Sequence, residues 1–334
     1  MKRATVLVLA ALLALLLGLS GCGSEKTVRF GTGGIGGTYY AYGTALAQMI
    51  SEENDKLSFS VKTTAGSAAN LRLLKEGFVQ LAVVQSDMLS DAVNGEGAFA
   101  EAGPYAGYAA IAGLYTEACQ IVVAADSDIK SVYDLAGKRV SVGEQESGVL
   151  KNAEEILLSY GVSLKMIEPR YLSFADSSSA LEKGEIDAFF CTAGAPTNAI
   201  SELSARKSIR LLPIDELIQN NIMRLYSGYT LCTIPAGTYA GQTEDVQTVG
   251  VKAVLVAAAD MKADTAEYIA RYLLENGGKL RYAVSAASEP DLAYAVGDIP
   301  CGFHEGAAKY YASKGVTVDT VSASSGKKVS ATQD

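Results

Sequence analysis

The sequence predicts an α/β fold with two lobes, mostly parallel sheets and a ligand cleft between the lobes. Its 334 residues are enough for two domains of about 100–200 residues each. A hydrophobic content of 49% and a charged content of 19% are typical of a globular protein. The strongest sign is an alternation of strand-like and helical segments that occurs twice along the chain, because such alternation favours parallel strands joined by right-handed crossovers.

The N-terminal segment predicts a lipoprotein signal peptide. Two basic residues follow Met1 and precede an apolar run over 6–17, which is shorter than the roughly 20 residues of a membrane span. Small residues then lead to Cys22, as in a lipobox, where the cysteine is acylated and becomes the mature N-terminus. We expect residues 1–21 to be removed and Cys22 to anchor the protein to a lipid bilayer through a linker at 22–26. The alternative is an ordinary cleaved signal beside a free cysteine.

The first copy of the alternating plan follows the linker. The expected order is a strand from Thr27, a glycine loop, a helix, a strand to about Thr64, a helix stopped at Gly77, and the buried strand Leu81–Val84. This order is a β-α-β-α-β run, which folds as one lobe.

The second copy occupies 138–194. A strand, a Gly/Ser loop and a helix fill 138–161, and a strand, a short helix ending near Gly184 and the buried strand Ala188–Cys191 follow. Ligands in such sheets bind beyond the carboxyl ends of the strands. Two lobes of this kind that face each other would form a cleft.

Apolar segments connect the two predicted lobes. The run 108–127, interrupted by Gly113 and Glu117, suits a strand that leaves the first lobe and enters the second. The segment 226–241 could return the chain, and 246–260 then supplies another buried strand. The expected division is a discontinuous domain I at 27–118 and 233–321, domain II at 119–232, and a frayed tail at 322–334.

Charge and histidine content exclude several kinds of function. A net charge of −9 works against nucleic acid as a partner, since such affinity comes from neutralised phosphates. The single histidine, His304, leaves no multi-histidine metal site, and we predict neither a metal nor a cofactor. A structural role is favoured for His304. The enzyme alternative is an exported hydrolase with Ser147 or Cys191 as nucleophile and His304 as base.

Four cysteines remain after Cys22, at positions 119, 191, 232 and 301. Outside the cell they could pair in any of three connectivities, and the sequence does not choose among them. No CxxC motif occurs, so neither a zinc site nor a redox pair is indicated. Four small buried thiols are the favoured interpretation of Cys119, Cys191, Cys232 and Cys301.

The segment from Gly31 to Gly36 satisfies the pattern GxGxxG between a strand and a helix. A nicotinamide site also expects an acidic residue at the end of the next strand, but that strand ends in the segment 61–64, Val-Lys-Thr-Thr. We therefore reject a dinucleotide site. Bare backbone amides and a helix N-terminus still favour a small anion, and a carboxylate fits as well as a phosphate.

Polar residues lie where the predicted strands end and the helices begin. Ser67 and Asn70 stand three residues apart at a helix start, where each could cap the helix or face a ligand. Gln85 directly follows the first buried strand. In the second copy the equivalent positions are 147–148 and the loop 192–196. We expect these four loops to converge on one cleft.

Several segments together resemble one known family, the TAXI receptors of TRAP transporters. The segments are GTGGIGGTYYAYGTALAQMI, GSAANLRLLKEG, LAVVQSD, LAGKRVSVGEQESGV, GEIDAFFCTAGAPT and FHEGAAKYYASKGV, in the family's order and spacing. The resemblance implies a two-lobe periplasmic-binding-protein-like fold of type II. It also implies an extracytoplasmic receptor, without enzymatic activity, that closes on a small carboxylate such as glutamate, glutamine or 2-oxoglutarate and delivers it to the membrane subunits of an ion-gradient-driven permease.

The resemblance also implies a ligand-lining set. The residues are Gly33, Gly34, Tyr39, Ser67, Asn70, Gln85, Ser147, Gly148, Ala193 and Gly194. This chain departs from a common family form at Glu305, where proline is frequent. It also carries Glu144 and Glu146 in the second glycine loop, where negative charge would oppose a dicarboxylate if the side chains face inward.

Three questions stay open at the level of sequence. The solute carboxylate could meet glycine-loop amides, Asn70, Gln85, or an arginine such as Arg170 or Arg224. The outer location could be a periplasm or a Gram-positive surface. A ligand-sensing lobe for a signalling partner would have the same fold as a transport receptor.

Overall fold

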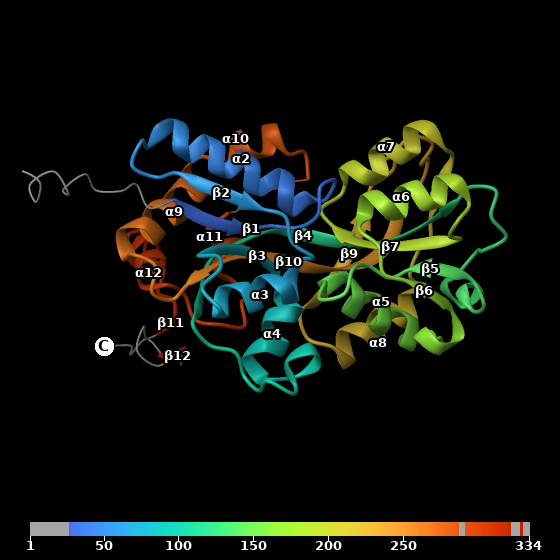
Figure 1. Ribbon diagram of the computed structural model, residues 1–334, viewed down its shortest axis with the longest axis horizontal. Helices are drawn as coiled ribbons and strands as arrows, with labels where there is room; N and C mark the ends of the chain where they lie inside the picture. The colour runs from blue at the N-terminus through green and yellow to red at the C-terminus, as the bar shows by residue number, and fades with distance from the viewer. Residues whose placement is uncertain (1–26, 287–290, 322–327, 330–334) are drawn as a thin grey trace, which may run out of the picture.

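The computed structural model describes residues 27–286, 291–321 and 328–329, and it shows two lobes built on one continuous sheet (Figure 1). The strand order along that sheet is β2-β1-β3-β10-β4-β7-β5-β6, with β8 beside β4 and β9 beside β10. The predicted signal peptide at 1–21, the linker at 22–26 and the lipidation site Cys22 lie outside the described residues. No helix within the described ranges is both long and apolar enough to cross a membrane.

The first lobe contains the N-terminal part of the chain and most of the C-terminal third. Its own strands are β1 (Val28–Gly31), β2 (Phe59–Lys62) and β3 (Leu81–Gln85). Its helices are α2 (Thr38–Glu53), α3 (Ser67–Lys75), α4 (Ser86–Asn94), α9 (Ala263–Glu275), α10 (Gly277–Ala283), α11 (Leu292–Val296) and α12 (Glu305–Ser313). Because helices cover the sheet, every residue of β3 is buried, as its apolar run indicates.

The second lobe repeats this plan. Its strands are β5 (Arg139–Ser141), β6 (Glu168–Arg170), β7 (Ala188–Ala193), β8 (Ile209–Leu211) and β9 (Tyr229–Ile234). Its helices are α5 (Gly148–Ser159), α6 (Phe174–Lys183), α7 (Asn198–Arg206) and α8 (Glu216–Leu225). In both lobes the first strand lies between the second and third, with parallel pairing.

Two long strands cross between the lobes, β4 (Tyr108–Ala124) and β10 (Val246–Ala258). In the second lobe β4 pairs with β7 and β10 with β9, whereas in the first lobe β10 pairs with β3; all these pairings are antiparallel. The sheet is therefore mixed, which corrects the expectation of mostly parallel pairing. The reason is the direction in which the chain crosses. β10 enters the first lobe beside β3, β4 enters the second lobe beside β7, and each runs opposite to that neighbour.

The run 108–127 was expected to cross between the lobes, and β4 confirms this. The expected return through 226–241 is wrong, because Pro235 ends β9 and the following turn sends the chain back along it as β10. The return crossing is therefore made by β10.

Hydrophobic packing follows the two lobes. One cluster contains buried residues up to Tyr115 and again from Ala253 onward. Two further clusters contain only residues between Ala118 and Val249. Residues of the segment 233–249, which the sequence analysis places in domain I, pack with the second lobe: Ile234 and Tyr239 in one cluster and Val249 in the other.

The C-terminal segment is partly described. β11 (Thr320–Val321) pairs in antiparallel fashion with β12 (Lys328–Val329). At 328–329 the structure thus differs from the expected frayed tail, because these two residues gain strand hydrogen bonds. The other residues of that tail lie outside the described ranges.

Candidate functional site

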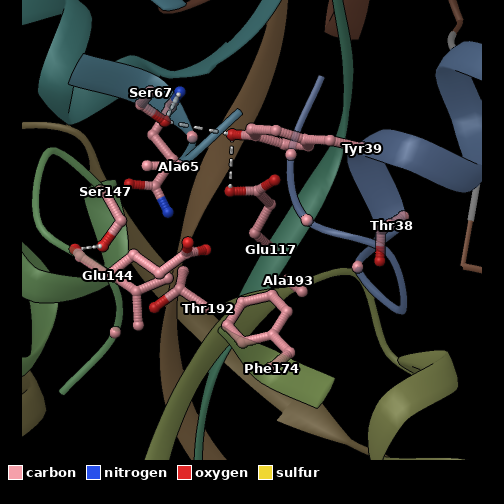
Figure 2. A pocket seen from close by; sticks show the side chains of 18 of the residues that line it. Thr38, Tyr39, Ala65, Ser67, Glu117, Glu144, Ser147, Phe174, Thr192 and Ala193 are labelled. Carbon is pink, nitrogen blue, oxygen red and sulfur yellow. Dashed lines mark hydrogen bonds between the residues drawn. The ribbon is translucent and has the colours of Figure 1, made fainter. Parts of the chain in front are cut away.

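A cavity lies between the two lobes, close to the place where β4 crosses (Figure 2). It contains about 520 Å³ of space that protein atoms do not occupy, part of it open to solvent. Its lining residues come from both lobes. They are Gly33, Gly34, Gly37, Thr38, Tyr39, Ala65, Gly66, Ser67, Gln85, Glu117, Gly143, Glu144, Ser147, Gly148, Val149, Leu172, Phe174, Thr192 and Ala193.

Three helices begin at this cavity. They are α2 and α3 of the first lobe and α5 of the second, and the residues around each start line the space. The residues before α2 and α3 are Gly37 and Gly66, and neither helix has a side-chain cap. The first N–H groups of a helix have no partner within the helix, and they carry the positive end of its dipole. The cavity therefore offers backbone donors to an anionic group.

The third helix start is capped by a side chain. Ser147 Oγ accepts a hydrogen bond from the Leu150 amide at 3.1 Å and donates to the Glu144 carbonyl at 2.6 Å. The Ser147 hydroxyl is therefore occupied in holding the loop, as a helix cap requires. It lines the cavity with both hydrogen bonds in place, so it is not poised as a nucleophile.

Glu117 is the most buried charged side chain of the cavity lining, with an exposed fraction of 0%. Tyr39 Oη donates to Glu117 Oε2 at 3.2 Å and lies 3.5 Å from Ser67 Oγ (Figure 2). Glu117 Oε1 has no hydrogen-bond partner among the described residues. Burial raises the pKa of Glu117 well above its usual range, and the nearby Asp87 raises it further, whereas the side-chain amide of Gln85 and the hydroxyl of Tyr39 oppose this rise.

Gln85, at the end of β3, supplies a second unpartnered acceptor. Asn152 Nδ2 donates to Asp87 Oδ2 at 2.9 Å, so Asn152 Oδ1 faces Gln85 Nε2, which donates to it at 3.2 Å. This orients the Gln85 amide and leaves Gln85 Oε1 buried without a partner among the described residues. Two acceptor oxygens of the lining are thus unsatisfied.

Glu144 brings a second carboxyl group to the lining, on the second lobe (Figure 2). Burial raises its pKa, and the nearby Asp176 raises it further. Phe174 and Leu172 form an apolar part of the same wall. Among the described residues, the lining contains no lysine, arginine or histidine. Arg170 and Arg224, considered as carboxylate partners from sequence, do not line this cavity.

Eight of the ten residues expected to line a ligand site lie in this cavity. They are Gly33, Gly34, Tyr39, Ser67, Gln85, Ser147, Gly148 and Ala193. Whether they bind a ligand stays a prediction. Of the two acids in the second glycine loop, Glu144 lines the cavity, whereas Glu146 forms an ion pair with Arg72.

Asn70 and Gly194 do not line the cavity. Asn70 Nδ2 donates to the Thr32 and Val83 carbonyls at 2.7 and 2.8 Å, so its amide joins α3 to two neighbouring strand ends. The Gly194 carbonyl accepts from Thr38 Oγ1 at 3.2 Å and from Thr197 Oγ1 at 2.8 Å. Both residues therefore stabilise the segments that form the cavity walls and do not face the cavity themselves.

Sequence reasoning missed the central position of Glu117. The sequence analysis noted Glu117 only as an interruption of an apolar strand. A lone carboxyl group in such a run is itself a sign of a functional site, because burying it without a partner is costly. Phe174 was also missed as a lining residue, whereas Thr192 belongs to the loop 192–196 that was expected at the cleft.

The two lobes touch around the cavity, so the structure is a closed arrangement. Arg72 on α3 forms an ion pair with Glu146 of the second lobe, with Nη2 and Oε2 3.0 Å apart. The Ala69 amide donates to the Glu146 carbonyl at 3.1 Å, and the Ala199 amide donates to the Gly36 carbonyl at 3.2 Å. These contacts close the cavity on two sides.

His304 and the cysteines take structural positions. His304 caps α12: Nδ1 accepts from the Gly306 amide at 3.2 Å, and Nε2 lies 3.0 Å from the Met261 carbonyl. Among the described residues Cys119, Cys191 and Cys232 are free thiols, and Cys119, Cys191 and Cys301 are buried. Burial raises the pKa of Cys191 and Cys119, which opposes thiolate formation. No group of three or more metal-binding side chains occurs within the described ranges.

Comparison with known proteins places the chain in a family and a fold. The NMT1-like family matches residues 30–315. A solved structure of a periplasmic transporter is 12% identical, with a TM-score of 0.54, covering 81% of this chain and 90% of the other. A protein from Bordetella bronchiseptica RB50 is 18% identical, with a TM-score of 0.53 and coverages of 86% and 82%. The periplasmic aliphatic sulphonate binding protein SsuA from Escherichia coli is 17% identical, with a TM-score of 0.45 and coverages of 78% and 73%. The structures with TM-scores of 0.54 and 0.53 confirm the expected periplasmic-binding-protein-like fold.

Proposed function

The chain belongs to the NMT1-like family, and from this premise we propose that it is an extracytoplasmic receptor that captures a small carboxylate solute between its lobes. The observation that carries the proposal is a cavity at the lobe boundary onto which three helix N-termini open. Backbone amides there can hold a carboxylate without an arginine or a lysine. The likeness of the fold to a periplasmic transporter supports an extracytoplasmic role.

The receptor binds its solute without chemical change. Ser147 uses its hydroxyl as a helix cap, Cys191 is a buried thiol with a raised pKa, and His304 caps a different helix outside the cavity lining. These three residues therefore do not form the nucleophile and base of a hydrolase.

The finer proposal is a receptor of the TAXI type that delivers its solute to the membrane subunits of a TRAP transporter, driven by an ion gradient. It rests on the sequence segments that resemble that family. Cys22 would carry the lipid anchor and hold the receptor at the outer face of the membrane. Replacement of Cys22 by serine should release the protein from the membrane fraction, and retention of the variant would contradict the anchor.

Binding is tested by titration calorimetry of the purified protein with glutamate, glutamine, 2-oxoglutarate, other dicarboxylates and short monocarboxylates. We expect saturable binding of at least one of these compounds, a rise in melting temperature, and recovery of the compound unchanged. Absence of binding to the whole panel, or chemical turnover of the bound compound, would contradict the proposal.

Transport is tested separately. Vesicles that contain the TRAP membrane subunits should take up the bound solute only with the receptor present and an ion gradient imposed. Uptake that needs ATP instead would contradict the TRAP assignment.

A further inference from the structure

Glu144 is the acid of the cavity lining that remains exposed to the cavity. It lies in the loop before α5 and is half-buried, whereas Glu117 is fully buried and accepts a hydrogen bond from Tyr39. Figure 2 shows the Glu144 side chain extending from the second lobe into the cavity. Among the described residues, none donates a hydrogen bond to its carboxyl group, and burial and the nearby Asp176 both raise its pKa. A second negative charge beside Glu144 would therefore be repelled.

The three helix starts at the cavity do not all remain open to the solute. Glu144 reaches across to the glycine loop that leads into α2, where a Cβ atom on Gly34 would lie 3.7 Å from Glu144 Oε2. The start of α2 thus already has a protein carboxyl group beside its loop. The starts of α3 and α5 have no acid in their first turns, and they adjoin, since a Cβ atom on Gly66 would lie 3.7 Å from Ser147 Cα. This junction remains for one carboxylate of the solute.

The second-lobe wall of the cavity is partly apolar. Val149, Leu172 and Phe174 contribute to this wall, and Figure 2 shows the Phe174 ring beside the cavity. No cationic side chain lines the cavity within the part of the chain that the structure describes. A second carboxylate would lose its hydration here without gaining a positively charged partner, which is costly. An uncharged apolar group would instead be stabilised by burial against the same wall.

We propose that Glu144 makes the receptor selective for a solute with a single carboxylate and an uncharged, largely apolar remainder. This inference rests on the proposed function and deepens it by naming the solute class. The carboxylate binds at the junction of α3 and α5, and the remainder of the solute packs against Leu172 and Phe174. Glutamate and 2-oxoglutarate, which the sequence resemblance implies, are then poor solutes, because each would bring a second carboxylate into a cavity that already contains Glu144.

The test compares compounds of similar size that differ by one negative charge. The purified protein is titrated by calorimetry with pentanoate, glutarate monoamide and glutarate; with 2-oxopentanoate and 2-oxoglutarate; with glutamine and glutamate; and with 3-phenylpropanoate and its 4-carboxyphenyl analogue. In each set that binds, the compounds with one carboxylate should bind at least about tenfold more tightly than the dicarboxylate, as expected for like charges brought together in a half-buried site. This comparison needs no variant.

Variants then assign the selectivity to Glu144. In Glu144→Gln the preference for one carboxylate over two should fall at least about tenfold, because the charge is removed while the size of the side chain is nearly kept. The matched control is Glu185→Gln, which removes the same charge from an exposed position of the second lobe outside the cavity lining and should keep the preference. Circular dichroism and a cooperative melting transition establish that both variants fold.

Each result decides a different claim. If the wild-type protein binds a dicarboxylate as tightly as the matching compound with one carboxylate, the inference is overturned and the carboxylate receptor stands. If a folded Glu144→Gln variant keeps the full preference, the assignment to Glu144 is overturned. If no compound of any set binds, both the inference and the proposed function fail.

Discussion

At Gly148, the first residue of α5, a side chain would collide with the opposite lobe. A Cβ atom there would overlap Gln85 Oε1 and would lie 3.1 Å from Ser67 Oγ, and both of these residues belong to the first lobe. The close approach of the lobes around the cavity therefore depends on glycine at this position, whereas the fold of α5 itself does not.

Replacement of Gly148 by alanine should weaken solute binding by about tenfold or more while leaving the stability of the unliganded protein within about 1 kcal/mol. The reason is that the added methyl group obstructs closure, not folding. Titration calorimetry and urea denaturation measure the two effects. Leu158→Ala, at an exposed position of the same helix, is the control. Unchanged affinity in Gly148→Ala would contradict the role of Gly148 in closure.

Single residues also show what the sequence can and cannot predict. Gln85 and Asn70 are both polar residues at the edge of a predicted element, and both were assigned to the ligand site. Gln85 lies in the cavity, but Asn70 turns toward the Thr32 and Val83 carbonyls. The sequence pattern predicts where along an element a polar side chain lies. The direction in which that side chain points depends on which backbone groups of neighbouring strands lack partners, and this is known only from the tertiary structure.

At the scale of elements, α4 of the first lobe and α5 of the second are joined by a buried polar network. Asn152 Nδ2 donates to Asp87 Oδ2 and lies 2.7 Å from Tyr229 Oη, which in turn donates to Glu155 Oε2 at 2.7 Å. Lys151 Nζ lies 3.2 Å from Asp91 Oδ2. Removing one member of a buried polar network leaves its partners with unsatisfied polar atoms, which is costly.

Removal of the Asn152 side chain should therefore cost about 2–3 kcal/mol of unfolding free energy, because Asn152→Ala leaves Asp87 and Gln85 with fewer partners in a buried site. Asn198→Ala, at the exposed first residue of α7, should cost no more than about 0.5 kcal/mol. Urea denaturation gives both values. Equal losses in the two variants would show that the network adds no stability.

The elements themselves were more predictable than their directions. Alternating apolar runs and helical faces predicted the strands and helices of both copies, including the buried strand β3 and the long strand β4. The antiparallel course of β10 was not predictable, because an apolar run such as 246–258 has the same composition in either direction. Only the position of its neighbours, β3 and β9, fixes it.

At the scale of the molecule, the two crossing strands explain how a cavity can open and close. β4 and β10 are the strands shared by both lobes, and Glu117 on β4 is paired with Val251 on β10 at the boundary between the hydrophobic clusters. A rotation of the lobes about these strands would separate α3 from α5 and leave each core intact. The ligand would bind to an open cleft and stabilise the closed arrangement described here by bridging the lobes.

The same boundary should make stability depend on pH near neutrality. Asp87 has an exposed fraction of 0%, and burial raises its pKa to about 7; Glu155 and Asp91 raise it too, while Lys151 and the Met88 amide lower it. The folded protein therefore binds a proton that the unfolded chain releases at about pH 4. Stability from this group is fully present below about pH 4, falls as the pH rises toward 7, and is lost above that.

Replacement of Asp87 by asparagine isolates this effect from that of the other carboxyl groups. The measured quantity is the difference in unfolding free energy between the wild-type protein and Asp87→Asn. This difference should fall between pH 5 and 7, by at most about 1.4 kcal/mol for each pH unit, and should be constant above pH 8. Urea denaturation at pH 5, 6, 7 and 8 measures the difference. Parallel pH profiles for the two proteins would show that Asp87 does not titrate in this range, and the interface between α4 and α5 would then hold a charged carboxylate stabilised by Lys151.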